Sequence, residues 1–159
     1  MAPDITSGSL QGTDTAAAVI QTFDTKNVGT LKTLTPSGVI TDGNSGNNYS
    51  YTYTPVSTGT ITTYAITFTS HTDSRIYNGS TSSSVAPDIT AGSLQGTDTA
   101  GAVIQTFDTK NVGTLKTLTP SGLITDGNSG NNYSYTYTPA NTGTITTYAI
   151  TFTAHTDSK

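Results

Sequence analysis

The stretch Tyr133-Ser134-Tyr135-Thr136-Tyr137-Thr138 alternates a large aromatic side chain with a small hydroxyl side chain. Because successive residues of a β-strand point to opposite faces, the three tyrosines share one face of such a strand. Tyr and Thr are also enriched in strands. The stretch therefore predicts a β-strand. Since no part of the chain carries apolar residues at convincing helical spacing, we expect an all-β fold.

The same strand occurs earlier, at residues 49–54, because the chain contains an internal repeat. Pro3-Asp4-Ile5-Thr6 returns as Pro87-Asp88-Ile89-Thr90, an offset of 84 residues that holds without a gap to the end of the chain. The aligned pairs that differ are Ser7/Ala91, Ala17/Gly101, Val39/Leu123, Val56/Ala140, Ser57/Asn141, Ser70/Ala154 and Arg75/Lys159. This period is longer than the ~20–50 residues of a solenoid unit and suits a small domain. The repeat predicts two tandem modules, residues 1–74 and 75–159.

The two copies differ at their beginnings. A full period opens with Arg75-Ile76-Tyr77, a predicted short strand, followed by the turn signal Asn78-Gly79. The first copy has no counterpart of this opening, so we expect Met1 to be an added start and the chain to be part of a longer array. A module that lacks this strand has an open sheet edge, which invites pairing with another chain.

Several further strands are predicted in the second copy, separated by polar turns. They span residues 102–107, 112–119, 133–138 and 144–153, with a broken edge segment around Pro87 at 85–94. Six or seven short strands per module are typical of an Ig-like β-sandwich. We expect two such modules arranged end to end, with residues 69–81 as a short joint between them.

The composition excludes several classes of function. The chain carries a net charge of −4 with six basic residues, too few for a surface that follows nucleic-acid phosphates. No apolar run approaches the ~20 residues of a membrane helix, so we expect no membrane insertion. With no cysteine, the chain has no disulfide or thiolate metal site. With this lack of cysteine, its polar excess of Thr, Ser, Asn and Gly favours a large exported protein over one from a reducing cytosol.

One loop in each copy has oxygen-bearing side chains at alternate positions, as calcium loops do. These candidate calcium ligands are Asp42 and Asn44 in the first copy and Asp126 and Asn128 in the second. The chain contains no Glu to act as a bidentate ligand, so a Gly/Asn turn explains the same residues. We expect no cofactor, with calcium as the alternative.

The row formed by Tyr133, Tyr135 and Tyr137 also has two interpretations. Its rings could stack on a sugar, or they could be the inward face of a sandwich strand with hydroxyls at the rim. The core interpretation is favoured, because an exposed row of three tyrosines is a sizeable apolar patch. The opposite rows of Thr resemble ice-binding surfaces, although one or two such strands per module fall short of a flat array.

Two further groups of residues raise chemical hypotheses. His71 and His155 lie near Asp73 and Asp157, but no nucleophile elbow accompanies them, so linker residues are the better interpretation. Lysines near asparagines raise the hypothesis of a Lys–Asn isopeptide bond. This bond needs a buried Lys, whereas Lys110 and Lys116 flank a turn and are expected to be solvated.

Three strings of the second copy resemble one known family, the YDG-type repeat domain. Ile76-Tyr77-Asn78-Gly79-Ser80-Thr81 resembles its Tyr-Asp-Gly opening, with Asn78 in place of Asp. The string 110–114, Lys-Asn-Val-Gly-Thr, is similar to its core, and 131–133 is similar to its Gly-Asn-Tyr segment. The resemblance implies a β-sandwich that occurs in tandem in large exported bacterial adhesins, including filamentous-haemagglutinin-like and autotransporter proteins. It implies no catalytic residues.

The expected function is therefore structural: a stalk that projects a distal binding domain, whose partners are the neighbouring identical repeats of the same chain. The alternative is a module that binds host or surface glycans, or ice, through the Tyr or Thr rows. A hydrolase is disfavoured, because paired acids, metal ligands and pocket motifs are missing from the sequence.

Overall fold

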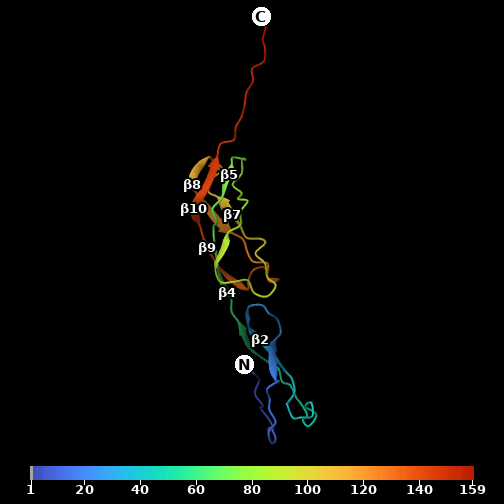
Figure 1. Ribbon diagram of the computed structural model, residues 1–159. Helices are drawn as coiled ribbons and strands as arrows, with labels where there is room; N and C mark the ends of the chain where they lie inside the picture. Colours follow the sequence, from blue (N-terminus) through green and yellow to red (C-terminus); the bar gives the residue numbers. More distant parts are fainter. Residues whose placement is uncertain (1) are drawn as a thin grey trace. The chain divides into compact units, whose positions relative to one another are not determined.

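The computed structural model describes residues 2–159 and is all-β, as the alternating pattern predicted (Figure 1). The described residues form strands, turns and loops; none of them belongs to a helix that could cross a membrane. The chain divides into two compact units, Met1–Thr62 and Thr63–Lys159, which are called unit 1 and unit 2 below.

Unit 2 contains a four-stranded sheet in the order β5-β10-β8-β7. Its two long central strands pair antiparallel, and β7 pairs antiparallel with β8 at one edge. At the other edge β5 pairs parallel with β10. The strands are β5 (Ser74–Ile76), β7 (Ile104–Phe107), β8 (Gly113–Ser121) and β10 (Ala140–Thr146).

A second sheet of unit 2 has three strands in the order β6-β4-β9. They are β4 (Tyr64–Thr69), β6 (Asp88–Ala91) and β9 (Tyr133–Thr138). The central strand, β4, runs antiparallel to β6 and parallel to β9. β9 coincides with the tyrosine-rich stretch, and β6 follows Pro87 at the sheet edge, where a proline can be accommodated.

Unit 1 has one three-stranded antiparallel sheet in the order β1-β2-β3. Its strands are β1 (Ile20–Phe23), β2 (Gly29–Ser37) and β3 (Val56–Ile61). They are the repeat counterparts of β7, β8 and β10. Among the described residues of unit 1, no strand takes the places that β4, β5, β6 and β9 occupy in unit 2.

The buried apolar residues are distributed very unevenly between the two units. Among the described residues, unit 1 contributes only Ile40. The rest form two clusters in unit 2: one of Ile66, Phe68, Val103, Ile124 and Tyr133, the other of Phe107, Leu118 and Ile145. Apolar burial is the main driving force for folding, so unit 2 has a developed core and unit 1 has little of one.

The two compact units have bounds that differ from those of the modules expected from the repeat. The units meet between Thr62 and Thr63, whereas the expected modules were 1–74 and 75–159. Residues 69–81, expected to be a joint, include β5 and the end of β4 and belong to unit 2.

The single strand expected at 144–153 is also wrong. β10 ends at Thr146, and its continuation forms no strand. In the first copy the same sequence forms two strands, β3 ending at Ile61 and β4 beginning at Tyr64. The physical reason is that Ile61 and Ile66 have opposite parity, so one strand would expose one of them. Splitting the segment lets each part serve a different core.

Candidate functional site

The most distinctive site of the molecule is the position between β6 and β9 in unit 2, which β4 occupies. Every residue of β4 is in register with β9, from Tyr64 opposite Tyr133 to Thr69 opposite Thr138. Ile66 and Phe68 point inward and are each 1% exposed. A strand from the first copy of the repeat therefore completes a sheet and a core whose other strands come from the second copy.

The tyrosine row of β9 lines this place. The hydroxyl of Tyr133 donates to Asp98 Oδ2 at 2.9 Å and accepts from the N–H of Gln95 at 2.8 Å. The hydroxyl of Tyr135 donates to the Gly130 carbonyl at 2.9 Å, and that of Tyr137 donates to the Gly122 carbonyl. Burial raises the pKa of all three phenols.

The rings of this row are part of the core packing. Tyr133 belongs to the buried cluster, and Tyr135 and Tyr137 pack against it. Tyr135 and Tyr137 also stack on each other with ring centroids 5.9 Å apart. In unit 2 the row, for which the core interpretation was favoured over a ligand face, therefore contacts β4 and the surrounding core.

The segment that follows β4 is held by a side chain that sequence reasoning missed, Gln105. Its Oε1 accepts the backbone N–H of His71 at 2.8 Å, and its Nε2 donates to the His71 carbonyl at 2.8 Å. Gln105 is 1% exposed. It pairs with the chain after β4 much as a neighbouring strand would. Its place in the predicted strand 102–107 was the only sequence signal, and a polar residue there reads as solvent-facing.

The His and Asp residues that lie near each other in the sequence have separate hydrogen-bond partners or are exposed. The buried Asp73 accepts a 2.7 Å hydrogen bond from the Ser83 hydroxyl, while Nδ1 of His71 lies 3.0 Å from the Thr72 carbonyl oxygen. His155 and Asp157 are exposed near the C-terminus. The hydrogen bond between Asp73 and Ser83 instead joins the residue just before β5 to the segment that leads into β6.

The Ile-Tyr-Asn-Gly string follows β5 and makes a local turn. Asn78 Oδ1 accepts the N–H of Ser80 at 3.1 Å, which is the hydrogen bond of an Asx-type turn. An aspartate at this position would offer the same kind of acceptor oxygen. The guanidinium of Arg75 lies over the Phe107 ring, 4.9 Å from its centroid, and ties β5 to the core beneath it.

The candidate calcium loop is organised by its own backbone. The carboxylate of Asp126 accepts the N–H groups of Asn128, Gly130 and Asn132 at 2.7, 2.8 and 3.0 Å. The side chain of Asn128 donates to that of Asn132. Asp42 makes the same three bonds in unit 1, to Asn44, Gly46 and Asn48.

The electrostatics of this loop follow from those bonds. Burial alone raises the pKa of Asp126, but the three N–H donors outweigh burial and hold the pKa below its usual value. Among residues 2–159, no group of three or more His, Asp or Glu side chains is arranged to hold a metal. Backbone groups therefore already use the oxygens that a cation would need.

Lys116, expected to be solvated, is buried. Its Nζ lies 2.8 Å from Asp108 Oδ1 and donates to Thr109 Oγ1 at 2.7 Å. The preceding residue, Leu115, has a φ of 53° at a register shift between β8 and β10 and is 77% exposed. This bulge turns Lys116 inward, a reversal that alternation alone cannot predict.

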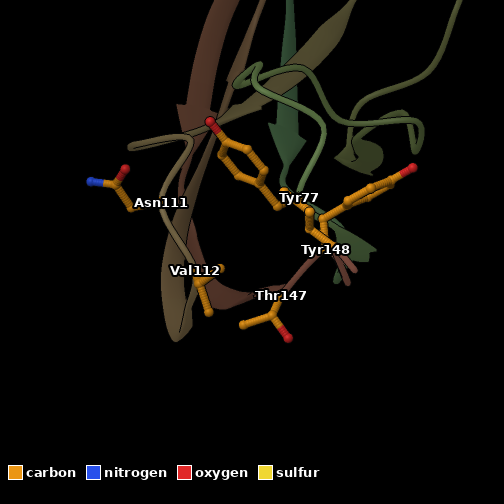
Figure 2. Close-up of a pocket in the computed structure, with 6 residues that line it drawn as sticks. Tyr77, Asn111, Val112, Thr147 and Tyr148 are labelled. Carbon is orange, nitrogen blue, oxygen red and sulfur yellow. The ribbon is translucent and has the colours of Figure 1, made fainter. Parts of the chain in front are cut away.

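A shallow pocket lies where the chain leaves β10 (Figure 2). Figure 2 shows the rings of Tyr77 and Tyr148 beside it, with Val112 and Thr147 further along. The lining residues are Tyr77, Asn111, Val112, Thr147, Tyr148 and Ile150. None of them is an acid, a base or a nucleophile positioned for catalysis.

Comparison with known proteins identifies one family. A family model described as the YDG domain matches residues 62–142. The match begins at the last residue of unit 1 and ends within β10, so it lies almost entirely in unit 2. No curated protein and no solved structure matches the chain.

Proposed function

The chain belongs to the YDG-domain family, and we propose from this premise that its units are spacer repeats of a long bacterial surface adhesin. In this proposal the repeats are exported to the cell surface, where they hold a distal binding domain away from the cell. The proposed role is mechanical and involves no catalysis.

The observation that carries the proposal is that one copy of the repeat supplies a strand to the unit formed mainly by the next copy. Unit 2 takes β4 from the first copy of the repeat, β5 spans the boundary between the two copies, and the other strands come from the second copy. β3 ends at Ile61 and β4 begins at Tyr64, so only two residues separate strands of successive units. Joints of this kind contain too little free chain to act as flexible linkers. Such a connection suits a load-bearing stalk.

We further propose that each complete unit is an Ig-like β-sandwich and that successive units are arranged end to end. Two sheets and two clusters of apolar residues in unit 2 support the sandwich. The near-absence of charge clusters and the lack of thiols are compatible with export.

The test compares chains that contain two, four and six periods. Small-angle scattering should give a maximum dimension that grows by a constant increment for each added period. Pulling on single molecules should give one unfolding event per complete unit. If the radius of gyration instead follows the compact scaling, growing roughly as the 0.38 power of length, the units collapse into one globule and the stalk is refuted.

A second candidate function is binding to glycans or ice through the outer face of β4 and β9. There Thr67 is opposite Thr136 and Thr69 is opposite Thr138, and the β9 threonines are exposed. Glycan arrays and partition into ice test it, with Thr136→Lys as the disrupting variant and Thr114→Lys on β8 as the matched control. Binding that only Thr136→Lys abolishes would favour this function over the spacer.

A further inference from the structure

Unit 1 and the greater part of unit 2 have nearly the same sequence but different surroundings. Residues 2–62 align with 86–146, and the pairs that differ are Ser7/Ala91, Ala17/Gly101, Val39/Leu123, Val56/Ala140 and Ser57/Asn141. In unit 2 the preceding residues, 63–84, supply β4 and β5. Within this chain those residues belong to unit 2, so unit 1 has neither strand.

The consequences for unit 1 can be measured residue by residue. Phe107 is 2% exposed in unit 2, whereas its counterpart Phe23 is 44% exposed. Residues 49–54, the counterpart of β9, and residues 4–7, the counterpart of β6, form no strand. The two segments that flank β4 in unit 2 thus lack the strand between them in unit 1.

The surroundings of two equivalent glycines show that unit 1 lacks the counterpart of β4. A Cβ on Gly92 would lie 2.4 Å from the carbonyl oxygen of Ala65, because β4 passes directly against it. At the counterpart, Gly8, nothing lies within 4 Å of that position, although φ is nearly the same, +80° against +77°. Gly8 therefore has the conformation that admits a strand, with open space where the strand would run.

The chain also contains a second strand of the right sequence. Residues 148–153 repeat the Tyr-Ala-Ile-Thr-Phe-Thr of β4 without a change. After β10 these residues form an extended segment that pairs with no described strand (Figure 1). Ile150 is 71% exposed and Phe152 is 93% exposed, whereas Ile66 and Phe68 are fully buried. Two large apolar side chains are thus presented on an unpaired extended segment.

We propose that residues 147–157 of one copy of this chain insert into unit 1 of a second copy, as β4 and its following segment do in unit 2. The copies then join head to tail. The pairing in unit 2 defines the register: Tyr148 lies opposite Tyr49, Ile150 opposite Tyr51 and Phe152 opposite Tyr53, all parallel. On the other side, Phe152 pairs with Ile5.

The segment beyond the strand fits the same site. Gln21 is the counterpart of Gln105, and His155 is the counterpart of His71. Gln21 is therefore placed to make the two backbone hydrogen bonds to His155 that Gln105 makes to His71. This inference rests on the strand geometry and is independent of the adhesin proposal; edge and gap filling by an added strand is a general mode of recognition.

A disulfide tests the register directly in the full chain. Ala65 is opposite Ser134 on the outer face of unit 2, so the counterparts Ala149 and Ser50 should face each other between copies. The chain has no cysteine of its own. Ala149→Cys with Ser50→Cys should give a ladder of covalent multimers on a non-reducing gel, because neighbouring strands lie within disulfide reach. Ala149→Cys with Thr54→Cys, about 13 Å out of register, should give at least tenfold less cross-linking.

A second measurement tests the role of the inward residues. Sedimentation of the unmodified chain should show multiples of 16.4 kDa whose share rises with concentration. Ile150→Asp with Phe152→Asp should leave monomers only, since both carboxylates would face the apolar gap. Ala149→Asp is the matched control, because the counterpart Ala65 is exposed, and it should still assemble.

Each result decides the proposal. In-register multimers that the Ile150/Phe152 variant loses support it. Monomers at every concentration, multimers that the variant retains, or equal cross-linking in both cysteine pairs overturn it. A cross-linked monomer also overturns it, because the tail would then occupy unit 1 of its own chain.

Discussion

Phe68 and Tyr137 stack with their ring centroids 6.2 Å apart and their planes 18° from parallel. Phe68 comes from the first copy of the repeat and Tyr137 from the second. They are opposite each other in the parallel pairing of β4 with β9. The core of unit 2 is therefore assembled from both copies, and the boundary of the folded unit is offset from the boundary of the sequence repeat.

Phe68→Ala should destabilise unit 2 strongly. Phe68 is buried among Ile66, Tyr137 and the rest of the first cluster, and removing a buried phenylalanine ring costs about 3–5 kcal/mol. Hydrogen exchange of β9 amides should report the loss as faster exchange through global opening of the unit.

The matched control for that experiment is Phe152→Ala. Phe152 occupies the same repeat position but is almost fully exposed. It should leave β9 exchange in unit 2 unchanged, within about 0.5 kcal/mol. If both variants weakened unit 2 equally, the assignment of β4 to this core would be wrong.

Much of the fold could be predicted from side-chain alternation. The strand at Tyr133–Thr138 was confirmed residue for residue, and those at 75–77, 102–107 and 112–119 were confirmed with small shifts at their ends. The edge position near Pro87 was also confirmed. The strict alternation of Tyr with Ser or Thr sufficed for β9, and the flanking turn residues helped to bound the other strands.

The remaining features depend on contacts between residues that lie far apart in the sequence or on local backbone irregularities. Alternation runs through residues 144–153 without interruption, so it cannot reveal that β10 ends at Thr146. The inward turn of Lys116 depends on the bulge at Leu115, where a non-glycine residue has a positive φ. The role of Gln105 depends on the path of His71, which lies 34 positions away. Such long-range partners leave no local pattern.

Gln105→Met should weaken unit 2 while preserving side-chain volume. The substitution removes both hydrogen bonds to the backbone of His71, and a typical intramolecular hydrogen bond contributes about 0.5–1.5 kcal/mol. Urea unfolding followed by exchange at β7 measures the change. Gln21→Met in unit 1 is the control, and on an unassembled chain it should be nearly neutral; equal losses would contradict the pinning role of Gln105.

Asp126→Asn should remove a pH-dependent part of the stability of unit 2. The pKa of Asp126 is held below 3.8 in the folded unit, so its stabilising contribution is present above that value. The contribution is lost as pH falls through the lower folded pKa. The variant should therefore be less stable than the unmodified chain at pH 7, and the gap should narrow on acidification.

Unfolding at pH 7, 5 and 3 measures this gap. Asp42→Asn makes the same change in the equivalent loop of unit 1 and should spare unit 2. A gap that stays constant from pH 7 to pH 3 would show that the carboxylate charge is not involved.

Calcium should have no effect on the same loop. Both carboxylate oxygens of Asp126 already accept backbone N–H groups, and a cation would have to displace them. Melting curves with millimolar calcium and with a chelator should coincide. A stabilisation of unit 2 that Asp126→Asn abolishes would restore the calcium interpretation.

Asp108→Ala should destabilise unit 2 more than Lys116→Met does. Removing Asp108 leaves the buried ammonium of Lys116 with Thr109 but no counter-charge, whereas methionine replaces the lysine with an apolar chain of similar length. The Lys116 hydrogen bond also lowers the pKa of Asp108, so the contribution of the pair should be lost as pH falls through that lowered value.

Hydrogen exchange of β8 amides in the two single variants and the double variant measures the coupling free energy between Asp108 and Lys116. A double variant as unstable as the sum of the singles would mean that the two side chains act independently.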